Sequence, residues 1–113
     1  MRLADVDFTE RDGSVIAAVR GEIDMSNANA LGDAVGGATP GDALRVVLDL
    51  TRVNYLDSAG IHLIFRLRQS LRDRDLELAV VIPPESPAND ALRLAGLMGR
   101  MEIARTLEEA LGT

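Results

Sequence analysis

Apolar and polar residues alternate at the start of the chain, where residues 4–9 read Ala-Asp-Val-Asp-Phe-Thr. This period of two is typical of a β-strand with one face in water. An Asp12-Gly13 pair follows, and such a pair readily adopts the positive φ angles of a tight hairpin turn. We therefore expect a second strand from Ser14 to Asp24 that pairs with the first in antiparallel orientation.

Two later segments, residues 43–50 and 76–82, are almost continuous apolar runs. Such runs are typical of strands that are covered on both faces. In the helix-like stretch between them, a helical period places four apolar residues on one stripe: Leu63, Ile64, Leu67 and Leu71. The pattern predicts a βαβ unit whose helix buries this stripe.

Capping signals mark the remaining elements. Ser26 is expected to cap a helix with the apolar residues Ala28, Leu31, Ala34 and Val35. A second helix is expected from Pro87, after the cap Ser86, through Ala91, Leu92 and Ala95 to Gly96. A short strand at 101–104 follows, and then a last helix between the Thr106 and Glu109 capping box and Gly112. The predicted fold class is α/β. We expect a single domain over residues 1–113, with a mixed sheet of four to five strands, about four helices and the element order ββαβαβαβα.

The composition supports a folded domain and excludes some classes of binding partner. The chain has 113 residues, 47% hydrophobic and 27% charged, which is ordinary for a globular protein with its own core. The net charge is −6 and there is no basic run, so neither nucleic acid nor an anionic membrane surface is an expected partner. Without an apolar stretch of membrane-spanning length or a signal-peptide pattern, the sequence predicts a cytoplasmic protein.

Several kinds of chemistry lack the residues they need. All 12 basic residues are Arg, which excludes a Schiff base on Lys. There is no Cys and only one His, so disulfides, thiolate metal sites and a zinc site are not expected. The sequence predicts neither a cofactor nor a metal.

The tetrad Asp57-Ser58-Ala59-Gly60 interrupts apolar sequence on both sides and raises two interpretations. Asp and Ser are preferred N-cap residues, so the tetrad could serve only to start a helix. Gly60 is a poor helix former, and its place in the first turn indicates that something approaches the backbone closely there. Whether Ser58 is also a site of modification stays open at this point.

The helix face opposite the buried stripe carries Ser58, His62, Phe65 and Gln69, with Ile61 at its margin. An apolar side chain such as Phe65 outside the buried stripe is a candidate for docking against a partner. The alternative is that Phe65 tucks under a neighbouring loop.

At this point the chain resembles the STAS superfamily and, within it, the anti-sigma factor antagonists, or anti-anti-sigma factors. The resemblance covers nearly the whole chain. The family's G-E-L-D element appears as residues 21–24, and its closing G-L and E-A-L patterns appear as residues 96–97 and 109–111. Its central signature is matched by Val46, Asp49, Leu50, Thr51, Val53, Tyr55, Asp57, Ser58 and Gly60.

This resemblance implies a regulatory cycle. Ser58 would be the phosphoacceptor of an anti-sigma factor kinase of the GHKL type; the unphosphorylated protein would bind that kinase and free a sigma factor, and a cognate phosphatase would reverse the modification. Ala59 removes a second acceptor that many members have, and His62, where Gly is usual, is expected to affect partner choice. The residues expected at the partner surface are Asp24, Asp57, Gly60, Ile61, His62 and Phe65.

Other functions find less support. A catalytic site on Asp57, Ser58 and His62 would lack a G-x-S-x-G elbow and an oxyanion loop, so no catalytic residue is expected. A phosphoaspartate receiver at Asp49 would lack that family's Lys. The closer alternative is a STAS subunit of a stress-signalling assembly, or an accessory to a lipid transporter, in which Ser58 is not phosphorylated.

Overall fold

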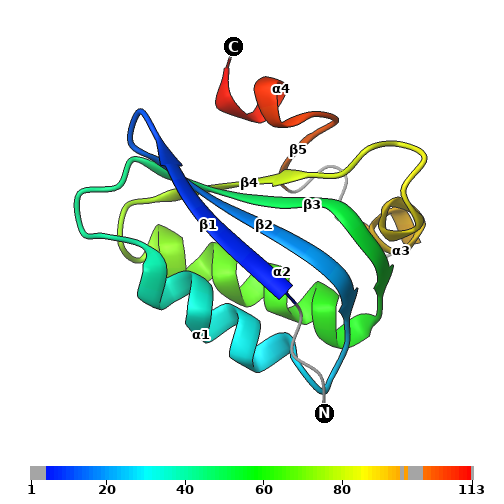
Figure 1. The fold of residues 1–113 in the computed structure, drawn as a ribbon. Coiled ribbons are helices and arrows are strands. Elements are labelled where there is room, and N and C mark those ends of the chain that lie inside the picture. The colour runs from blue at the N-terminus through cyan, green and yellow to red at the C-terminus, as the bar shows by residue number, and fades with distance from the viewer. Residues whose placement is uncertain (1–4, 95, 97–100, 113) are drawn as a thin grey trace.

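The computed structural model describes residues 5–94, 96 and 101–112. These residues form helices and strands in the order ββαβαβαβα that the sequence predicts (Figure 1). The elements are β1 Asp5–Arg11, β2 Ser14–Ile23, α1 Ala28–Ala38, β3 Arg45–Leu56, α2 Ser58–Arg72, β4 Glu77–Val81, α3 Pro87–Leu94, β5 Glu102–Ala104 and α4 Leu107–Leu111.

A mixed sheet is the centre of the fold. Its five strands lie in the order β1-β2-β3-β4-β5. β1 runs antiparallel to β2, whereas β2, β3, β4 and β5 are parallel to one another. α1 and α2 lie against one face of the sheet and α4 lies on the other (Figure 1). The predicted mixed α/β architecture is confirmed.

The turn between β1 and β2 has the geometry that the sequence predicts. Asp12 and Gly13 have φ angles of 52° and 85°, and two positive values in succession define a type I′ turn. This turn places Arg11 opposite Ser14 and so sets the register of the whole hairpin.

The sheet buries apolar side chains on both faces. Val46 and Leu48 of β3 belong to the larger core, which also contains residues of α1, α2 and α3. Val47, between them, belongs to a smaller core with Ala110 of α4. The near-continuous apolar runs therefore mark strands with neighbours on both sides, as predicted. The predicted α2 stripe is buried at all four positions: Leu63, Ile64, Leu67 and Leu71.

β3 is longer than the apolar run that predicted it. The sequence indicated residues 43–50, whereas the strand spans Arg45–Leu56. Its outer half keeps Val53 and Leu56 buried, but these two residues are three positions apart rather than two. The parallel register with β2 shifts twice along this stretch. Such irregularities break the period of two by which strands are found in a sequence.

The start of α1 differs from the prediction. Ser26 was expected to cap this helix, but the helix begins at Ala28 and Asn27 holds the N-cap position. Even Asn27 makes no side-chain cap bond; its amide accepts from the Asp24 N–H at 3.0 Å and donates to the Glu22 carbonyl at 2.8 Å. Ser26 is not the cap because its hydroxyl bonds to the Asp24 carboxylate.

The C-terminal elements follow the predicted signals. α3 begins at Pro87, and the predicted member Ala95 lies outside the described residues. β5 falls within the expected segment 101–104. At the start of α4, the Thr106 hydroxyl accepts from the Glu109 N–H at 3.1 Å. This bond confirms the expected N-cap.

Candidate functional site at the start of α2

β2 and β3 end side by side at the edge of the sheet that is formed by the carboxyl ends of its parallel strands. Ile23 faces Leu56 as the last residue pair of these parallel strands, and the Asp57 N–H donates to the Ile23 carbonyl at 3.3 Å. Asp24 and Asp57 are the next residues of the two strands, so both leave the sheet at the same edge. The fold thus brings together two acidic residues that are distant in the sequence.

Asp57 is the N-cap of α2. Its backbone is extended, with φ −100° and ψ −171°, as is usual for an N-cap residue. Its Oδ1 atom accepts from the Ala59 N–H at 2.9 Å and the Gly60 N–H at 3.1 Å, and its carbonyl accepts from the Ile61 N–H at 3.1 Å. The Asp57 side chain therefore satisfies two of the backbone donors that a helix start leaves open, and its carbonyl accepts the first regular bond of the helix.

Ser58 is the first residue of α2 and its side chain is exposed. Within the ranges that the structure describes, its hydroxyl makes no hydrogen bond. Capping therefore explains Asp57 and not Ser58. The arrangement leaves an alcohol in solvent, one residue past the cap, where another protein can reach it.

The loop that carries Asp24 is held by its own side chains. The Ser26 N–H and hydroxyl donate to Asp24 Oδ1 at 2.8 and 2.5 Å. These bonds lower the pKa of Asp24 from its ordinary value, because they stabilise the charged form. Asn27, which is 4% exposed, bridges the loop to the end of β2. The Asp24 carboxylate is therefore ionised at neutral pH and fixed in position.

A family model for the STAS domain matches residues 5–110. The chain belongs to the STAS domain family. Its BtrV relative in Bordetella bronchiseptica, provisionally named an anti-sigma factor antagonist, is 28% identical over 99 residues, which cover 88% of this chain and 84% of that protein.

Solved structures agree with this family. A crystal structure of an anti-sigma factor antagonist from Mycobacterium paratuberculosis has a TM-score of 0.83 at 28% identity, covering 96% of this chain and 92% of that one. SpoIIAA of Bacillus, solved in its phosphorylated form, has a TM-score of 0.66 at 20% identity and covers 96% of this chain and 97% of its own. The latter likeness shows the shared fold.

Gly60 in this STAS domain is buried, which corrects one expectation. A Cβ atom at Gly60 would lie 2.3 Å from Leu56 Cδ1 and 3.1 Å from Ile23 Cγ2. The close approach that the sequence indicated therefore comes from the chain's own strand ends and not from a partner. Gly60 lets α2 pack onto the sheet, and its burial leaves it without exposed surface to offer a partner.

The predicted exposed row on α2 is only partly exposed. His62 and Gln69 face solvent, whereas Phe65 and the marginal Ile61 are half-buried and pack against the larger core. The sequence left Phe65 open between docking and packing; the structure shows it partly packed against the core, because the apolar face of α2 is wider than its four-residue stripe. Ser58 and His62 share a helix face, but the Ser58 hydroxyl does not bond to the imidazole, as an activated nucleophile would.

Two exposed apolar side chains near this site were missed in the sequence. Met25 is 82% exposed and Tyr55 is 49% exposed. Met25 follows Asp24, and Tyr55 precedes the Leu56 that pairs with Ile23. The available signal for Met25 was a lone apolar residue in the polar stretch Asp24-Met25-Ser26-Asn27. These side chains place apolar surface at the same edge as Ser58.

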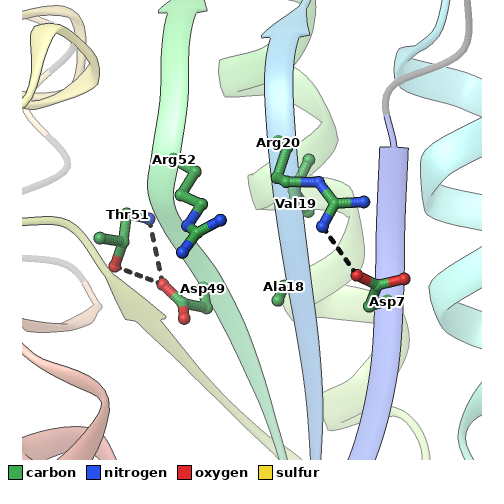
Figure 2. Close-up of a pocket in the computed structure, with 7 residues that line it drawn as sticks. All are labelled: Asp7, Ala18, Val19, Arg20, Asp49, Thr51 and Arg52. Carbon is green, nitrogen blue, oxygen red and sulfur yellow. Dashed lines mark hydrogen bonds and ion pairs between the residues drawn. The ribbon is translucent and has the colours of Figure 1, made fainter.

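A separate hollow of about 340 Å³ lies over β1, β2 and β3 on the face away from α1 and α2 (Figure 2). Arg20 bonds to Asp7 across its wall at 3.0 Å. Asp49 accepts from the N–H and hydroxyl of Thr51 at 3.0 and 2.5 Å. Arg20 and Asp7 are thus engaged with each other, and Asp49 is engaged with the neighbouring Thr51.

Two classes of site are not found in the described part of the chain. No helix there is long and apolar enough to cross a membrane. The described residues also contain no group of three or more His, Cys, Asp or Glu side chains that could hold a metal ion.

Proposed function

We propose that this STAS domain is an anti-sigma factor antagonist that acts by partner switching in the cytoplasm. In this proposal the unphosphorylated protein binds an anti-sigma factor kinase of the GHKL type and frees a sigma factor. Phosphorylation of Ser58 ends that binding, and a cognate phosphatase restores it. Support comes from the antagonist names of its relatives and from the phosphorylated form of SpoIIAA, which has the same fold.

The exposed and unbonded hydroxyl of Ser58 is the observation that carries the proposal. The Ala59, Gly60 and Ile61 N–H groups already donate to Asp57. A phosphate on Ser58 could therefore be added without breaking these bonds to Asp57. It would lie at a helix start, where the helix dipole favours an anion. The modification should leave the fold intact and change only the surface that a partner meets.

The switch itself would be electrostatic. A phosphate adds a charge of about −1.5 to −2 at neutral pH, beside the side chain of Asp57 and at the same sheet edge as Asp24. Repulsion between unit charges about 5 Å apart is about 3 kcal/mol at an effective dielectric constant near 20. If forming the interface with the kinase increases this repulsion by about half of that energy, the affinity for the kinase falls about tenfold.

The surface around Ser58 suits a protein partner better than a small substrate. Met25 and Tyr55 offer exposed apolar area, Asp24 offers a fixed charge, and His62 offers a polar group one turn into α2. Ile61 is half-buried and contributes only its exposed part. An apolar patch beside fixed charges is typical of protein interfaces. In this role the protein is a kinase substrate and not an enzyme.

Phosphate transfer tests the acceptor. The wild-type protein, Ser58→Ala and Ser70→Ala are each incubated with ATP, Mg²⁺ and purified GHKL-type kinases of the source organism, one kinase at a time. Ser70 is an exposed serine on the same helix, so it is a matched control. We expect one phosphate on the wild-type protein and on Ser70→Ala, and none on Ser58→Ala.

Two results would count against the proposal. Equal labelling of Ser58→Ala and wild type would remove Ser58 as the acceptor. Tight binding to a kinase without any labelling would instead favour a STAS subunit of a signalling assembly that is not switched by phosphate.

A further inference from the structure

β1 is an edge strand of the sheet, so one of its two sides is not paired with another described strand. Among the described residues it pairs with β2 alone, and it spans seven residues, whereas the opposite edge strand, β5, spans three. A free edge presents backbone N–H and C=O groups in a row, ready to pair with another strand. β1 is therefore the element best able to extend this sheet with a strand from another chain (Figure 1).

The hairpin register fixes which backbone groups of β1 point outward. In a two-residue type I′ hairpin, the pair that closes the turn is hydrogen-bonded, and the pairs then alternate. Arg11 and Ser14 close the turn here. The residues whose N–H and C=O groups point away from β2 are consequently Val6, Phe8 and Glu10.

Phe8 lies in the middle of this outward set. It faces Ala17 of β2, which belongs to the larger core, so its side chain is on the α1 and α2 side of the sheet. It is nevertheless 36% exposed, because no strand in the described part of the chain lies on the outer flank of β1. The alternation of residues 4–9 places Phe8 on the apolar face of the strand, and the edge position explains why its burial is incomplete.

We propose that two copies of this chain associate through antiparallel pairing of their β1 strands about a twofold axis at Phe8. Phe8 would face Phe8 of the second copy, and Val6 would face Glu10. All three outward-pointing residues of each strand would then be hydrogen-bonded, and the two sheets would join into one. A twofold interface of this kind uses the same patch on both copies.

Charge complementarity supports this register. It places Asp5 opposite Arg11 of the other copy, twice. Within the described ranges the ion pairs are Arg20 with Asp7 and Arg45 with Glu77, so Asp5 and Arg11 have no ion-pair partner of their own. Opposite charges on facing residues stabilise antiparallel strands. A twofold axis at Asp7 would instead place Asp7 against its own copy.

The test is the oligomeric state and its response to charge. We expect the wild-type protein to approach twice the 12.1 kDa chain mass as its concentration rises in sedimentation velocity. Asp5→Arg places Arg against Arg11, and Arg11→Glu places Glu against Asp5, so each variant alone should dimerise about tenfold more weakly or worse. An equimolar mixture of the two variants restores both opposite-charge pairs, and it should dimerise about as well as the wild type.

Cross-linking tests the register separately. The chain has no cysteine, so Phe8→Cys can form a disulfide only with its own copy. Facing residues in a hydrogen-bonded pair have Cα atoms about 5.5 Å apart, within disulfide range. Glu10→Cys is the matched control, because two copies of residue 10 would be four positions out of register, roughly 13 Å.

Two outcomes would overturn the proposal. One is a wild-type protein that keeps a single-chain mass at every concentration. The other is a variant mixture that is no more dimeric than either variant alone. Far-UV circular dichroism and melting temperatures confirm that each variant is folded, so that a loss of dimer reports the interface.

Discussion

Asp57 and Ser58 are neighbours at the start of α2, yet only Asp57 bonds to the helix backbone. The tetrad alone could not separate their roles, since both residue types are good caps. The structure separates them by one position: the cap precedes the helix and Ser58 is its first residue. The capping interpretation and the phosphoacceptor proposal therefore concern different side chains.

This division predicts different stability effects. Asp57→Ala removes the acceptor of the Ala59 and Gly60 N–H groups, so it should lower the free energy of unfolding by about 1 kcal/mol. Asp57→Asn can still accept these bonds and should retain most of that stability. Ser58→Ala should stay within about 0.5 kcal/mol of the wild type. Urea unfolding followed by circular dichroism measures all three, and an equal loss in Ser58→Ala and Asp57→Ala would contradict the assignment.

α2 reaches the sheet at its first turn because Gly60 has no side chain. Leu56 and Ile23, the last residues of β3 and β2, occupy the space that a Cβ would need. The same contact places the helix start beside the two strand ends and so positions Ser58 at the sheet edge. The packing of one glycine thus links the core to the candidate site.

Two glycine substitutions should have opposite effects. Gly60→Ala gains helix propensity, but the added Cβ pushes the side chains of Leu56 and Ile23 away from α2. We therefore expect a net loss of about 1 to 3 kcal/mol in the free energy of unfolding. Gly37→Ala, at an exposed position of α1 with nothing within 4 Å of the added Cβ, should gain up to about 1 kcal/mol. Thermal and urea unfolding compare them. If Gly60→Ala proved as stable as Gly37→Ala, the packing account would be wrong.

Local sequence signals predicted most elements but not their contacts. The type I′ turn, the four buried residues of α2 and the Thr106 cap all follow from neighbours in the chain. The outer half of β3, the bridging role of Asn27 and the partial burial of Phe65 do not. These features depend on register shifts and on packing between distant segments, which no local period encodes.

At the scale of the whole molecule, the chain and the surface around Ser58 are both acidic. The chain carries a net charge of −6, and Asp24 and Asp57 follow the paired ends of β2 and β3 at the sheet edge beside Ser58. A phosphate there would add charge without displacing a hydrogen bond, since the helix start is already capped by Asp57. The proposed switch therefore requires no change of fold, only a change in what the partner meets.

The most direct test of this account is the affinity of the kinase for the two forms of the protein. Isothermal titration calorimetry compares the unphosphorylated protein, the Ser58-phosphorylated protein and Ser58→Glu, with circular dichroism as the control for folding. We expect phosphorylation to weaken binding about tenfold or more, with Ser58→Glu weakened in the same direction and all three spectra alike. Equal affinity of the phosphorylated and unphosphorylated forms would contradict the proposed switch.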